Sequence, residues 1–340
     1  MKTISLFNIL LLFLFYNMLA ACKTHSLGAG KRQQLQGKII VITGASSGLG
    51  KGIALDAGRS EATVILASRN KDELEKVAEE VIASGGKALV VPTDVSIESN
   101  IKALAEQTVA RFGRIDVWIN NAGIAVLGRY WETPLRDQMR VVDVNLNGTM
   151  LGSYYALNQF KKQGFGVLIN ISSVEAEIPT AYQAAYSISK AGVRTLGNTL
   201  RQELRLAGYK NIKVVTILPY ALDTPLWDHV AVYTGHAPRM IAMDDPQKAV
   251  NTVMHAIFSK RKELAVGWKA RLSIDAHRAL PGVMERAGSN IVQKYQAEIT
   301  PPVPPSKGNL YQSMPTPGVE GGIRERMKIE KKQRKSRRLN

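Results

Sequence analysis

The sequence has few of the residues that hold a disulfide framework or a metal centre. Its 340 residues include one cysteine, Cys22, so no disulfide can form within the chain. The five histidines show no spacing typical of metal ligands. They are His25, His229, His236, His255 and His277. We therefore expect neither a disulfide-stabilised scaffold nor a metal site.

Acidic residues are scarce relative to basic ones, and part of the excess positive charge is local. The chain contains 28 Asp and Glu against 45 Lys and Arg, which gives a net charge of +17. Residues 324–340 alone contain nine Lys or Arg and two Glu. Such a run is typical of a solvated tail, and the alternatives are contact with anionic lipid headgroups or with nucleic acid. We expect no specific nucleic-acid partner.

The apolar run near the start of the chain is short. Ile9 to Tyr16 contains no strongly polar residue, whereas a membrane-spanning helix needs roughly 20 apolar residues. The run is typical of a secretory signal peptide. The next residues, Leu19-Ala20-Ala21-Cys22, resemble a bacterial lipobox, whose cysteine is lipidated. We predict a signal peptide with a lipobox over residues 1–22, and the alternatives are an uncleaved membrane anchor or a leader with an incidental cysteine.

The remaining composition, 45% hydrophobic and 21% charged, is that of a folded globular protein. Between residues 37 and 265, short apolar runs alternate with longer segments of helical character. The runs predict strands at 39–43, 63–67, 88–91, 117–120, 167–171 and 214–218. Helices are predicted between them, the first three at 47–57, 71–83 and 96–112. Strands that are apolar on both faces and separated by helices predict an α/β fold with a doubly wound parallel sheet, Rossmann-like.

The segments that flank this domain carry weaker signals. Residues 23–36 are predicted to be a polar linker. Residues 266–299 are predicted to be a helical extension, interrupted at Pro281-Gly282. Residues 300–340 begin with a proline-rich run, which is typical of a stiff extended segment, and end in a basic tail that we expect to be mobile.

Three glycines follow the first predicted strand, where the chain enters the first helix. They are Gly44, Gly48 and Gly50, in a segment that reads Thr-Gly-Ala-Ser-Ser-Gly-Leu-Gly. Without side chains, the backbone N–H groups of such a turn can approach a pyrophosphate at the helix N-terminus. Glycine clusters also form ordinary turns, but the position between a buried strand and a helix favours dinucleotide binding.

The end of the second strand favours NADP over NAD as the cofactor. An acidic residue there would bind the ribose 2′-hydroxyl and repel a 2′-phosphate. This sequence has Ser68-Arg69 instead, and Lys51 directly follows the last glycine of the turn. Two cations near one phosphate predict NADP(H), and NAD is the less favoured alternative. The alternative interpretation of the two residues is that both are solvated surface charges.

A tyrosine and a lysine lie four residues apart, which places them on one face of a helix. They are Tyr186 and Lys190, and they follow an Asn-Asn-Ala-Gly run at 120–123 after the fourth strand. A lysine ammonium beside a tyrosine is expected to lower the pKa of the phenol, so that it can act as a general acid or base. The pair alone occurs by chance in many helices, but its combination with the glycine turn does not.

Together these motifs resemble the short-chain dehydrogenase/reductase family over roughly residues 37 to 230. The resemblance implies that Tyr186 exchanges a proton with the substrate oxygen and that Lys190 also holds the nicotinamide ribose. Ser173, thirteen residues before Tyr186, would bind the substrate oxygen in preference to its neighbour Ser172. Asn145 matches the family's structural and proton-relay asparagine.

The same resemblance implies a set of cofactor-binding residues. Asp94 and Val95 match the pair that contacts the adenine, and Asn121 matches a residue near the nicotinamide. Thr224 lies where the family places a ligand of the carboxamide. The full predicted set is Gly44, Ser46, Ser47, Gly48, Leu49, Gly50, Ser68, Arg69, Asp94, Val95, Asn121, Ala122, Gly123, Tyr186, Lys190, Pro219 and Thr224.

One position departs from the family pattern. After the sixth strand this chain has Pro219-Tyr220, where family members usually have Pro-Gly, so we expect the tyrosine to reshape the pocket beside the nicotinamide or to project into it. Six aromatic or apolar residues suggest an apolar substrate site, although each can equally be a packing residue. They are Trp131, Tyr182, Tyr220, Leu226, Trp227 and Tyr233.

The sequence thus predicts an NADP-dependent oxidoreductase that interconverts a carbonyl and an alcohol, and the alternative is a membrane-tethered sensor or scaffold without turnover. The family often pairs subunits through two long helices, here at 145–159 and 186–206, so a homo-oligomer is expected. The signals for location disagree. A lipobox would export the domain, whereas NADP(H) is cytoplasmic and Lys23, Lys31, Arg32 and Lys38 favour a cytoplasmic side. We therefore predict membrane association without assigning a side.

Overall fold

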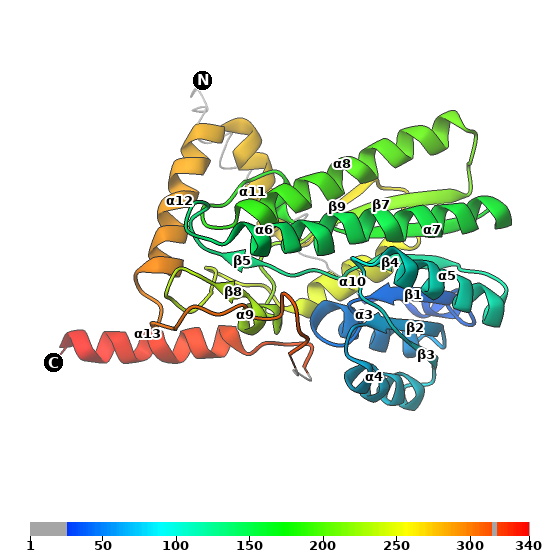
Figure 1. The fold of residues 1–340 in the computed structure, drawn as a ribbon, viewed down its shortest axis with the longest axis horizontal. Coiled ribbons are helices and arrows are strands. Elements are labelled where there is room, and N and C mark those ends of the chain that lie inside the picture. The colour runs from blue at the N-terminus through cyan, green and yellow to red at the C-terminus, as the bar shows by residue number, and fades with distance from the viewer. Residues whose placement is uncertain (1–25, 315–317, 340) are drawn as a thin grey trace, which may run out of the picture.

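The computed structural model describes residues 26–314 and 318–339. Its centre is one parallel seven-stranded sheet in the order β3-β2-β1-β4-β6-β7-β9 (Figure 1). The strands are β1 (Ile39–Thr43), β2 (Thr63–Ser68), β3 (Lys87–Pro92), β4 (Val117–Asn120), β6 (Gly166–Ile171), β7 (Ile212–Leu218) and β9 (Glu263–Ala265). The order reverses between β1 and β4, which is the switch point where doubly wound sheets bind their ligands. The predicted fold class is therefore confirmed.

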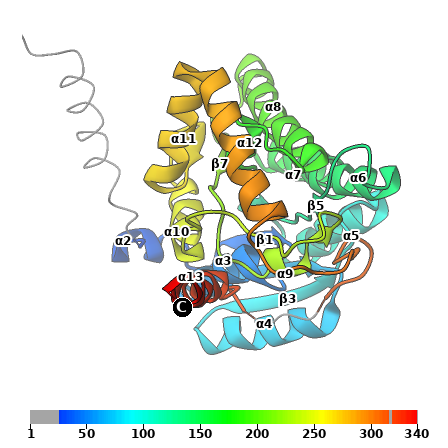
Figure 2. The ribbon, with the colours of Figure 1, turned by 90° about the vertical axis from the view of Figure 1, so that its left-hand side faces the viewer.

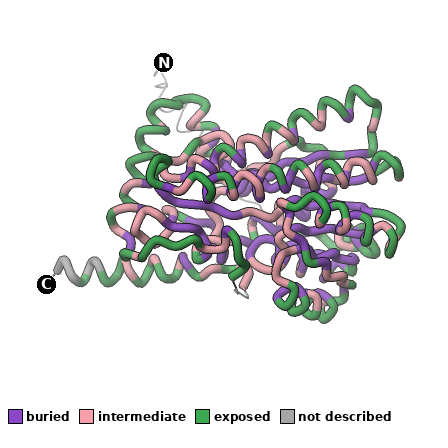
Figure 3. The backbone as a smooth tube through the Cα atoms, viewed as in Figure 1, coloured by how far each residue is buried: buried purple, intermediate pink, exposed green. Residues whose placement is uncertain are grey.

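Helices cover both faces of the sheet because successive strand residues point to opposite sides. Ile40 and Ile42 pack on one face with three helices, and Ile39 and Val41 pack on the other with four. The first group is α3 (Gly48–Gly58), α4 (Lys71–Ala83) and α10 (Pro246–Ala256). The second is α5 (Glu98–Phe112), α6 (Leu135–Val142), α7 (Gly148–Gln163) and α8 (Ala184–Leu206). Figure 3 shows the buried residues concentrated in the strands between these layers.

Short elements gather at the carboxyl ends of the strands. A two-stranded parallel sheet joins β5 (Val126–Leu127) to β8 (Ala231–Val232), next to α9 (Leu226–His229). A π-helical turn, η1 (Asp143–Asn147), interrupts the chain between α6 and α7. A 3-10 turn, η2 (Val174–Ala176), follows β6. These elements form the end of the molecule where the site lies.

The C-terminal extension packs on the same end. Its helices are α11 (Gly267–Ala279) and α12 (Pro281–Ala297), which divide at the predicted Pro281-Gly282 interruption. Figures 1 and 2 show α12 running toward α9, β5 and β8, with α11 beside it and both helices away from the far ends of α7 and α8. Ala270 and Ile274 of α11 are buried against Val174 and Leu218. The extension therefore contributes a wall to the site.

The last forty residues differ from the expected mobile tail. The proline-rich segment is extended as expected, and it pairs with the 232–236 region through bridges at Ser306 and Pro302. Residues Ile323–Leu339, however, form a helix, α13. Its first turn is held by the carboxylate of Asp223, which accepts hydrogen bonds from the backbone N–H groups of Ile323 and Arg324. A buried acid one hundred residues away thus caps a segment that has no local signal for docking.

The N-terminal linker is also more ordered than expected. It contains the short helix α2 (Ala29–Gln33), and Leu27 and Leu35 are buried in the core beside α3. Arg32 pairs with the buried Asp56 at 2.9 Å. The predicted signal peptide and lipobox, residues 1–22, lie outside the described residues. Within the ranges that are described, no helix combines the length and the hydropathy that a membrane span requires.

Candidate active site

The glycine turn between β1 and α3 has a geometry that only glycine allows. Gly44 and Gly48 have φ angles of +67° and +55°, in the left-handed region. A Cβ atom at Gly50 would lie 2.1 Å from the carbonyl oxygen of Gly44. The turn is thus packed against itself, and it directs the N-terminus of α3 toward the carboxyl ends of β1 and β4.

The end of β4 is tied to this turn by side chains. Asn121 donates through Nδ2 to the carbonyl oxygens of Thr43 and Gly44, at 2.9 and 3.1 Å. The hydroxyl of Thr43 accepts from the backbone N–H groups of Asn121 and Ala122. The predicted Asn121 therefore positions the turn, and its neighbours Ala122 and Gly123 border the same space.

A cavity of about 420 Å³ begins at the glycine turn and ends among the C-terminal helices. Almost all of the residues predicted to bind cofactor line it, together with three of the four predicted catalytic residues. Two predicted residues do not line the cavity, Gly50 and Asn145. The predicted residues on its wall are Gly44, Ser46, Ser47, Gly48, Leu49, Ser68, Arg69, Asp94, Val95, Asn121, Ala122, Gly123, Ser173, Tyr186, Lys190, Pro219 and Thr224.

The residues at this end of the cavity fit a dinucleotide. Gly44 and Gly48 line the cavity without side chains, and the helix N-terminus that follows favours an anion. Within the described ranges, the buried hydroxyl of Ser68, at the end of β2, has no hydrogen-bond partner. An unpaired buried hydroxyl is costly unless a ligand completes it, so its position on the cavity wall suits a ribose hydroxyl or phosphate.

The two cations predicted to select NADP have different surroundings. Arg69 lines the cavity at the end of β2, and burial lowers the pKa of its guanidinium. Lys51 instead lies on α3, where its ammonium contacts Glu80 of α4 at 2.8 Å, and it does not line the cavity. Lys51 therefore does not lie with Arg69 on the cavity wall, as two cations near one phosphate would, because helix α3 directs its side chain toward α4. Of these two cations, Arg69 alone lines the cavity.

Asp94, predicted to contact the adenine, is part of an ion pair that the sequence did not reveal. Its carboxylate lies 2.8 Å from Arg140 of α6 and accepts from Ser96 at 2.7 Å. Burial acts to raise the pKa of Asp94, but the hydrogen bonds from Ser96 and Arg140 hold it below the ordinary value. The pair brings Arg140 to the cavity wall near Arg69, and both arginines donate to the carbonyl oxygen of Leu310.

The predicted serine, tyrosine and lysine meet in the middle of the cavity. Ser173 follows β6, its hydroxyl accepts from the backbone N–H of Glu175 at 3.1 Å, and it lines the cavity together with Tyr186 of α8. The ammonium of Lys190 lies 5.5 Å from the centre of the Tyr186 ring and donates to the carbonyl oxygen of Ile171 at 2.9 Å. Ser172, the less favoured serine, donates to the carbonyl oxygen of Lys190 at 2.7 Å. The arrangement leaves the hydroxyl of Ser173 and the phenol of Tyr186 on the same wall.

The pKa of Tyr186 differs from the expected direction. Burial raises it above the ordinary value, the nearby carboxylate of Glu175 raises it further, and the hydrogen bond from Ser173 acts in the opposite direction. Burial also lowers the pKa of Lys190 to about 8, although Glu175 acts to raise it. Desolvation therefore outweighs the attraction between the ammonium and a tyrosinate that the spacing predicted.

Asn145 lies outside the cavity wall, in the π-helical turn η1. Its side chain donates to the carbonyl oxygen of Ile124 and accepts from the N–H of the same residue, both at 2.9 Å. It also donates to the hydroxyl of Ser189 on α8. π-Helical turns are rare in proteins, and those that occur are frequently found at functional sites. Here it fixes the strand-end loop after β4 to the helix of Tyr186, so the structural part of the prediction matches these contacts.

Glu175 is a site residue that the sequence analysis missed. It lies two residues after Ser173 in η2, lines the cavity, and accepts from the hydroxyl of Ser187 at 3.0 Å. Burial raises the pKa of its carboxyl group to about 7, against hydrogen bonds from Ser187 and Thr180. A carboxyl group that titrates near neutrality beside Tyr186 and Lys190 couples the charge of all three groups.

The far end of the cavity is apolar, and three of the six predicted substrate residues line it. These three are Tyr220, Leu226 and Trp227. Tyr220, at the position that departs from the family pattern, is held by a hydrogen bond from its hydroxyl to the carbonyl oxygen of Ile241. The other three, Trp131, Tyr182 and Tyr233, do not line the cavity, and Trp131 is 80% exposed.

Helices α11 and α12 form the rest of the wall at this end of the cavity. The hydrophobic periodicity of the sequence predicts the helices but not their place in the site. They contribute Ser273, Met284, Glu285, Ala287, Gly288, Ile291 and Val292. Over the described residues, no group of three or more His, Cys, Asp or Glu side chains is placed to hold a metal ion.

Comparisons with known proteins agree with this architecture. Residues 38–232 match the short chain dehydrogenase family. A ketoacyl reductase of Nostoc, HetN, is 34% identical over 68% of this chain and 79% of its own length. The 3beta-hydroxysteroid dehydrogenase 1 of Eggerthella lenta is 37% identical over 56% of this chain and 73% of its own. A metagenomic short-chain oxidoreductase solved in complex with NADP has a TM-score of 0.58 and 29% identity, covering 68% of this chain and 97% of that one.

The family match covers more than half of the chain, and it includes the glycine turn, β4 and the Tyr186-to-Lys190 helix. The chain therefore belongs to the short-chain dehydrogenase family and is a nicotinamide-dependent oxidoreductase that acts on CH–OH or C=O groups.

Proposed function

We propose that this protein is an NADP(H)-dependent oxidoreductase that interconverts a carbonyl and an alcohol on a large apolar substrate. The observation that carries the proposal is the shared cavity: Tyr186, Ser173 and Lys190 line the same space as the glycine turn and Arg69. One end thus offers donors for a nucleotide, and the other offers apolar surface. The proton-transfer groups lie between the two.

In this proposal Tyr186 gives a proton to the substrate oxygen in reduction and removes it in oxidation. A bound nicotinamide supplies or accepts the hydride. Ser173, which lines the same cavity as Tyr186, holds the substrate oxygen within reach of the phenol. The ammonium of Lys190 is held by its hydrogen bond to the carbonyl oxygen of Ile171. It places positive charge beside the phenol ring, which favours the tyrosinate when the proton leaves.

The choice of NADP(H) over NAD(H) rests on Arg69. An arginine at the end of β2 pairs with a phosphate through two parallel hydrogen bonds, whereas a ribose hydroxyl gains little from its charge. The described wall near Ser68 contains Arg69 and Arg140, while Asp94 is already paired with Arg140. Of these three side chains, the guanidinium of Arg69 thus has the charge and the position that an added phosphate needs.

The apolar substrate class rests on the far wall. Leu226, Trp227 and Ile291 face the same cavity from α9 and α12, together with Met240 and Met284. An apolar ligand gains free energy by removing such surface from water. The hydroxysteroid and ketoacyl specificities named for two relatives are both of this apolar kind.

The test is a titration of the purified protein with NADPH and with NADH, followed by nicotinamide fluorescence, and then a screen of apolar ketones and secondary alcohols. We expect NADPH to bind at least tenfold more tightly, because a charged hydrogen-bonding pair adds that much to affinity. Turnover of at least one ketone should follow. If neither cofactor binds, the proposal is wrong. If NADPH binds and no carbonyl turns over, a sensor without turnover would replace it.

We propose two further properties. The first is self-association through α7 and α8, on whose surfaces Met150, Tyr154 and Ile188 are exposed. Light scattering of the purified protein measures this, and a monomer at micromolar concentration would contradict it. The second is membrane association through residues 1–22. Intact-mass analysis of the protein from its native membrane should show a lipidated Cys22 start, whereas an intact Met1 would indicate an anchor.

A further inference from the structure

Two described pieces of the C-terminal segment, residues 306–314 and 318–324, lie along the cavity that would hold the cofactor; we call them the strap. The strap lies beyond the residues that match the family, 38–232. In Figure 1 the first piece runs toward α3 and α4, and the second leads into α13. Asn309, Ser313 and Met314 form part of the cavity wall.

The first piece is attached at the adenosine end. Arg69 donates through Nη2 to the carbonyl oxygen of Asn309 at 2.7 Å and through Nη1 to that of Leu310 at 3.2 Å. Arg140 donates to the same Leu310 oxygen at 3.0 Å. The side chain of Leu310 is fully buried in the core on the α5–α7–α8 face. The strap therefore orients both arginines of this end through its backbone.

The start of this piece is fixed as well. Ser306 exchanges two backbone hydrogen bonds with Val232 of β8, at 2.8 and 3.0 Å. At Gly308 the chain passes so close to α9 that a Cβ there would lie 2.1 Å from the carbonyl oxygen of His229. The strap is thus built into the end of the molecule and does not lie loosely on it.

The second piece crosses the glycine turn. The N–H of Gly48, at the first residue of α3, donates to the carbonyl oxygen of Gly318 at 2.9 Å. Val319 packs next to Gly52, where an added Cβ would lie 3.1 Å from Cγ1 of Val319 and 2.7 Å from Cγ2 of Val250. The strap therefore passes over the part of the site that binds phosphate in proteins with such a turn.

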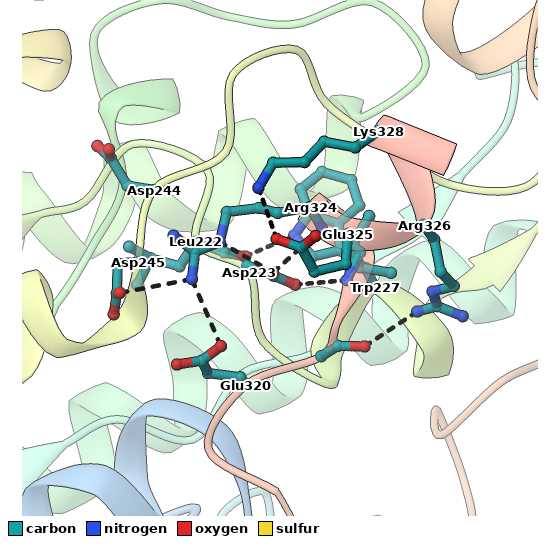
Figure 4. Close-up of polar contacts among 12 residues, drawn as sticks. Leu222, Asp223, Trp227, Asp244, Asp245, Glu320, Arg324, Glu325, Arg326 and Lys328 are labelled. Carbon is teal, nitrogen blue, oxygen red and sulfur yellow. Dashed lines mark hydrogen bonds and ion pairs between the residues drawn. The ribbon is translucent and has the colours of Figure 1, made fainter. Parts of the chain in front are cut away.

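The second piece ends on Asp223, which is buried and directly precedes Thr224. Figure 4 shows Asp223 among the residues at the start of α13. Its carboxylate accepts from the N–H groups of Ile323 and Arg324 at 2.8 and 3.1 Å, and from Nε of Arg324 at 3.1 Å. Its carbonyl oxygen accepts from Gly321 at 3.0 Å. The strap is thus attached at the nicotinamide end to the neighbour of the predicted carboxamide ligand.

Two roles are conceivable for a segment in this place: it could occupy the nucleotide's space, or it could cover that space. The cavity decides between them. It is open beneath the strap, and both the glycine turn and Ser313 face it. Two buried oxygens on its wall, Ser68 Oγ and Asn309 Oδ1, are without a partner among the described residues. A competing segment would fill this space and pair these atoms. The strap engages N–H donors of Arg69 and Gly48, but it leaves the cavity beside them open and both oxygens without a partner, as expected of a cover.

We propose that the strap is part of the cofactor site: it closes over the bound dinucleotide from the adenosine to the nicotinamide end, so that the cofactor leaves only when the strap opens. This inference rests on the proposed NADP(H) function. Opening must break the charged hydrogen bonds at Asp223 and those at Arg69, which limits the rate of release.

The experiment compares the full-length protein with Asp223→Asn, which removes the negative charge that holds the start of α13. The matched control is Asp228→Asn, because Asp228 pairs with Arg326 of the same helix at 2.7 Å on the exposed side. NADPH is bound to each protein and displaced by excess NADP⁺, and the loss of nicotinamide fluorescence gives the dissociation rate. Hydrogen exchange of the strap amides, with and without NADPH, is the second readout.

We expect Asp223→Asn to release NADPH about tenfold faster or more, since charged hydrogen bonds are lost, and the control to release it at the wild-type rate. In the wild type, NADPH should slow exchange at the amides of Gly321 and Ile323. If Asp223→Asn does not fold, Arg324→Ala tests the same attachment from the other partner.

Three outcomes would overturn the inference. Release could be unchanged although the strap amides of the variant exchange faster, or NADPH could leave the wild-type strap amides unprotected. The variant could also bind NADPH more tightly and faster, which would make the strap a competitor. Failure of the wild type and the control to bind any NADP(H) would instead contradict the proposed function itself.

Discussion

The two ends of the cavity are built in different ways. At the cofactor end the wall is formed mainly by backbone, namely glycines with positive φ and a helix N-terminus. Side chains such as Asn121 fix this backbone, because its amide donates to two carbonyl groups. At the substrate end the wall is a set of apolar side chains from α9, α11 and α12. The cofactor end tolerates little change, because backbone conformation and hydrogen bonds fix the positions of its atoms. The second can be reshaped by substituting one side chain at a time.

The residues that transfer protons lie between these ends, and they supply the largest predicted effect. Tyr186→Phe removes the hydroxyl and keeps the ring that lies beside Lys190. We expect turnover to fall by roughly 10²–10⁴, because a positioned general acid contributes about that factor. NADPH affinity should change little. Steady-state rates and fluorescence titration measure the two, and an undiminished rate would exclude Tyr186 as the proton donor.

The rigidity of the cofactor end is tested by Gly50→Ala. The new Cβ would lie 2.1 Å from the Gly44 carbonyl, so the turn must open. We expect a loss of about 2–4 kcal/mol in the free energy of unfolding, with loss of NADPH binding. The matched control is Gly282→Ala in α12, where a Cβ meets nothing within 4 Å and helix propensity predicts a gain of about 0.5–1 kcal/mol. Equal stabilities in urea unfolding would contradict the contrast.

The selectivity of the cofactor end is tested by Arg69→Gln. We expect NADPH affinity to fall about 10- to 100-fold, since the charged partner of the 2′-phosphate is lost, while NADH affinity stays within about threefold. Arg111→Gln on α5, outside the cavity wall, is the control. Titrations with both cofactors give the ratio. A parallel fall for NADH would assign Arg69 a general role in holding the adenosine or the strap.

The reaction rate at the proton-transfer groups between the two ends should depend on pH, because burial raises the carboxyl pKa of Glu175 to about 7. Its charged form raises the pKa values of both Tyr186 and Lys190. Glu175→Gln should therefore lower both pKa values and shift the whole pH profile of alcohol oxidation to lower pH. A titration near pH 7 should disappear.

The control for this shift is Glu177→Gln. Glu177 pairs with Arg194 and Arg278 and does not line the cavity. Its substitution should leave the profile in place. The measurement is kcat/KM for an accepted alcohol between pH 6 and 10. Identical profiles for the wild type and Glu175→Gln would show that Glu175 does not influence the proton-transfer groups.

The smallest effect is expected at the substrate end. Ile291→Ala in α12 widens the apolar wall, and we expect KM for an apolar substrate to rise about three- to tenfold. The value of kcat and the affinity for NADPH should not change, because no group of the cofactor end moves. A comparable fall in kcat would mean that the two ends are less independent than their construction indicates.

The sequence predicted the regular parts of this molecule well for a physical reason. The strands are apolar on both faces and read as short runs, and β1 and β4 have the predicted bounds. The glycine turn and the Tyr186–Lys190 spacing are local patterns, so they could be found without the fold. The resemblance to a family then supplied Ser173 and completed the set of cofactor residues. Of all the residues predicted to be catalytic or to bind cofactor, seventeen line one cavity.

Other features depend on contacts between distant residues and carry no local signal. The direction of Lys51 toward Glu80 follows from the packing of α3 on α4. Trp131 is aromatic in a substrate-lining segment, yet it points to solvent. The strap and α13 look like a solvated basic tail until Asp223 and Arg69 are placed beside them. Glu175 follows Ser173 by two positions, but only the fold shows that its carboxyl group is buried.

The ends of the sheet show how this protein avoids unwanted association. At one edge β3 begins with Lys87 and ends with Pro92, and at the other β9 has three residues, the first of which, Glu263, is held by Arg194 at 2.9 Å. Charge, proline and short length make both edges poor templates for a strand from another molecule. The sheet is therefore poorly suited to extension by neighbouring copies, which favours contacts between helical surfaces over edge-to-edge aggregation of strands.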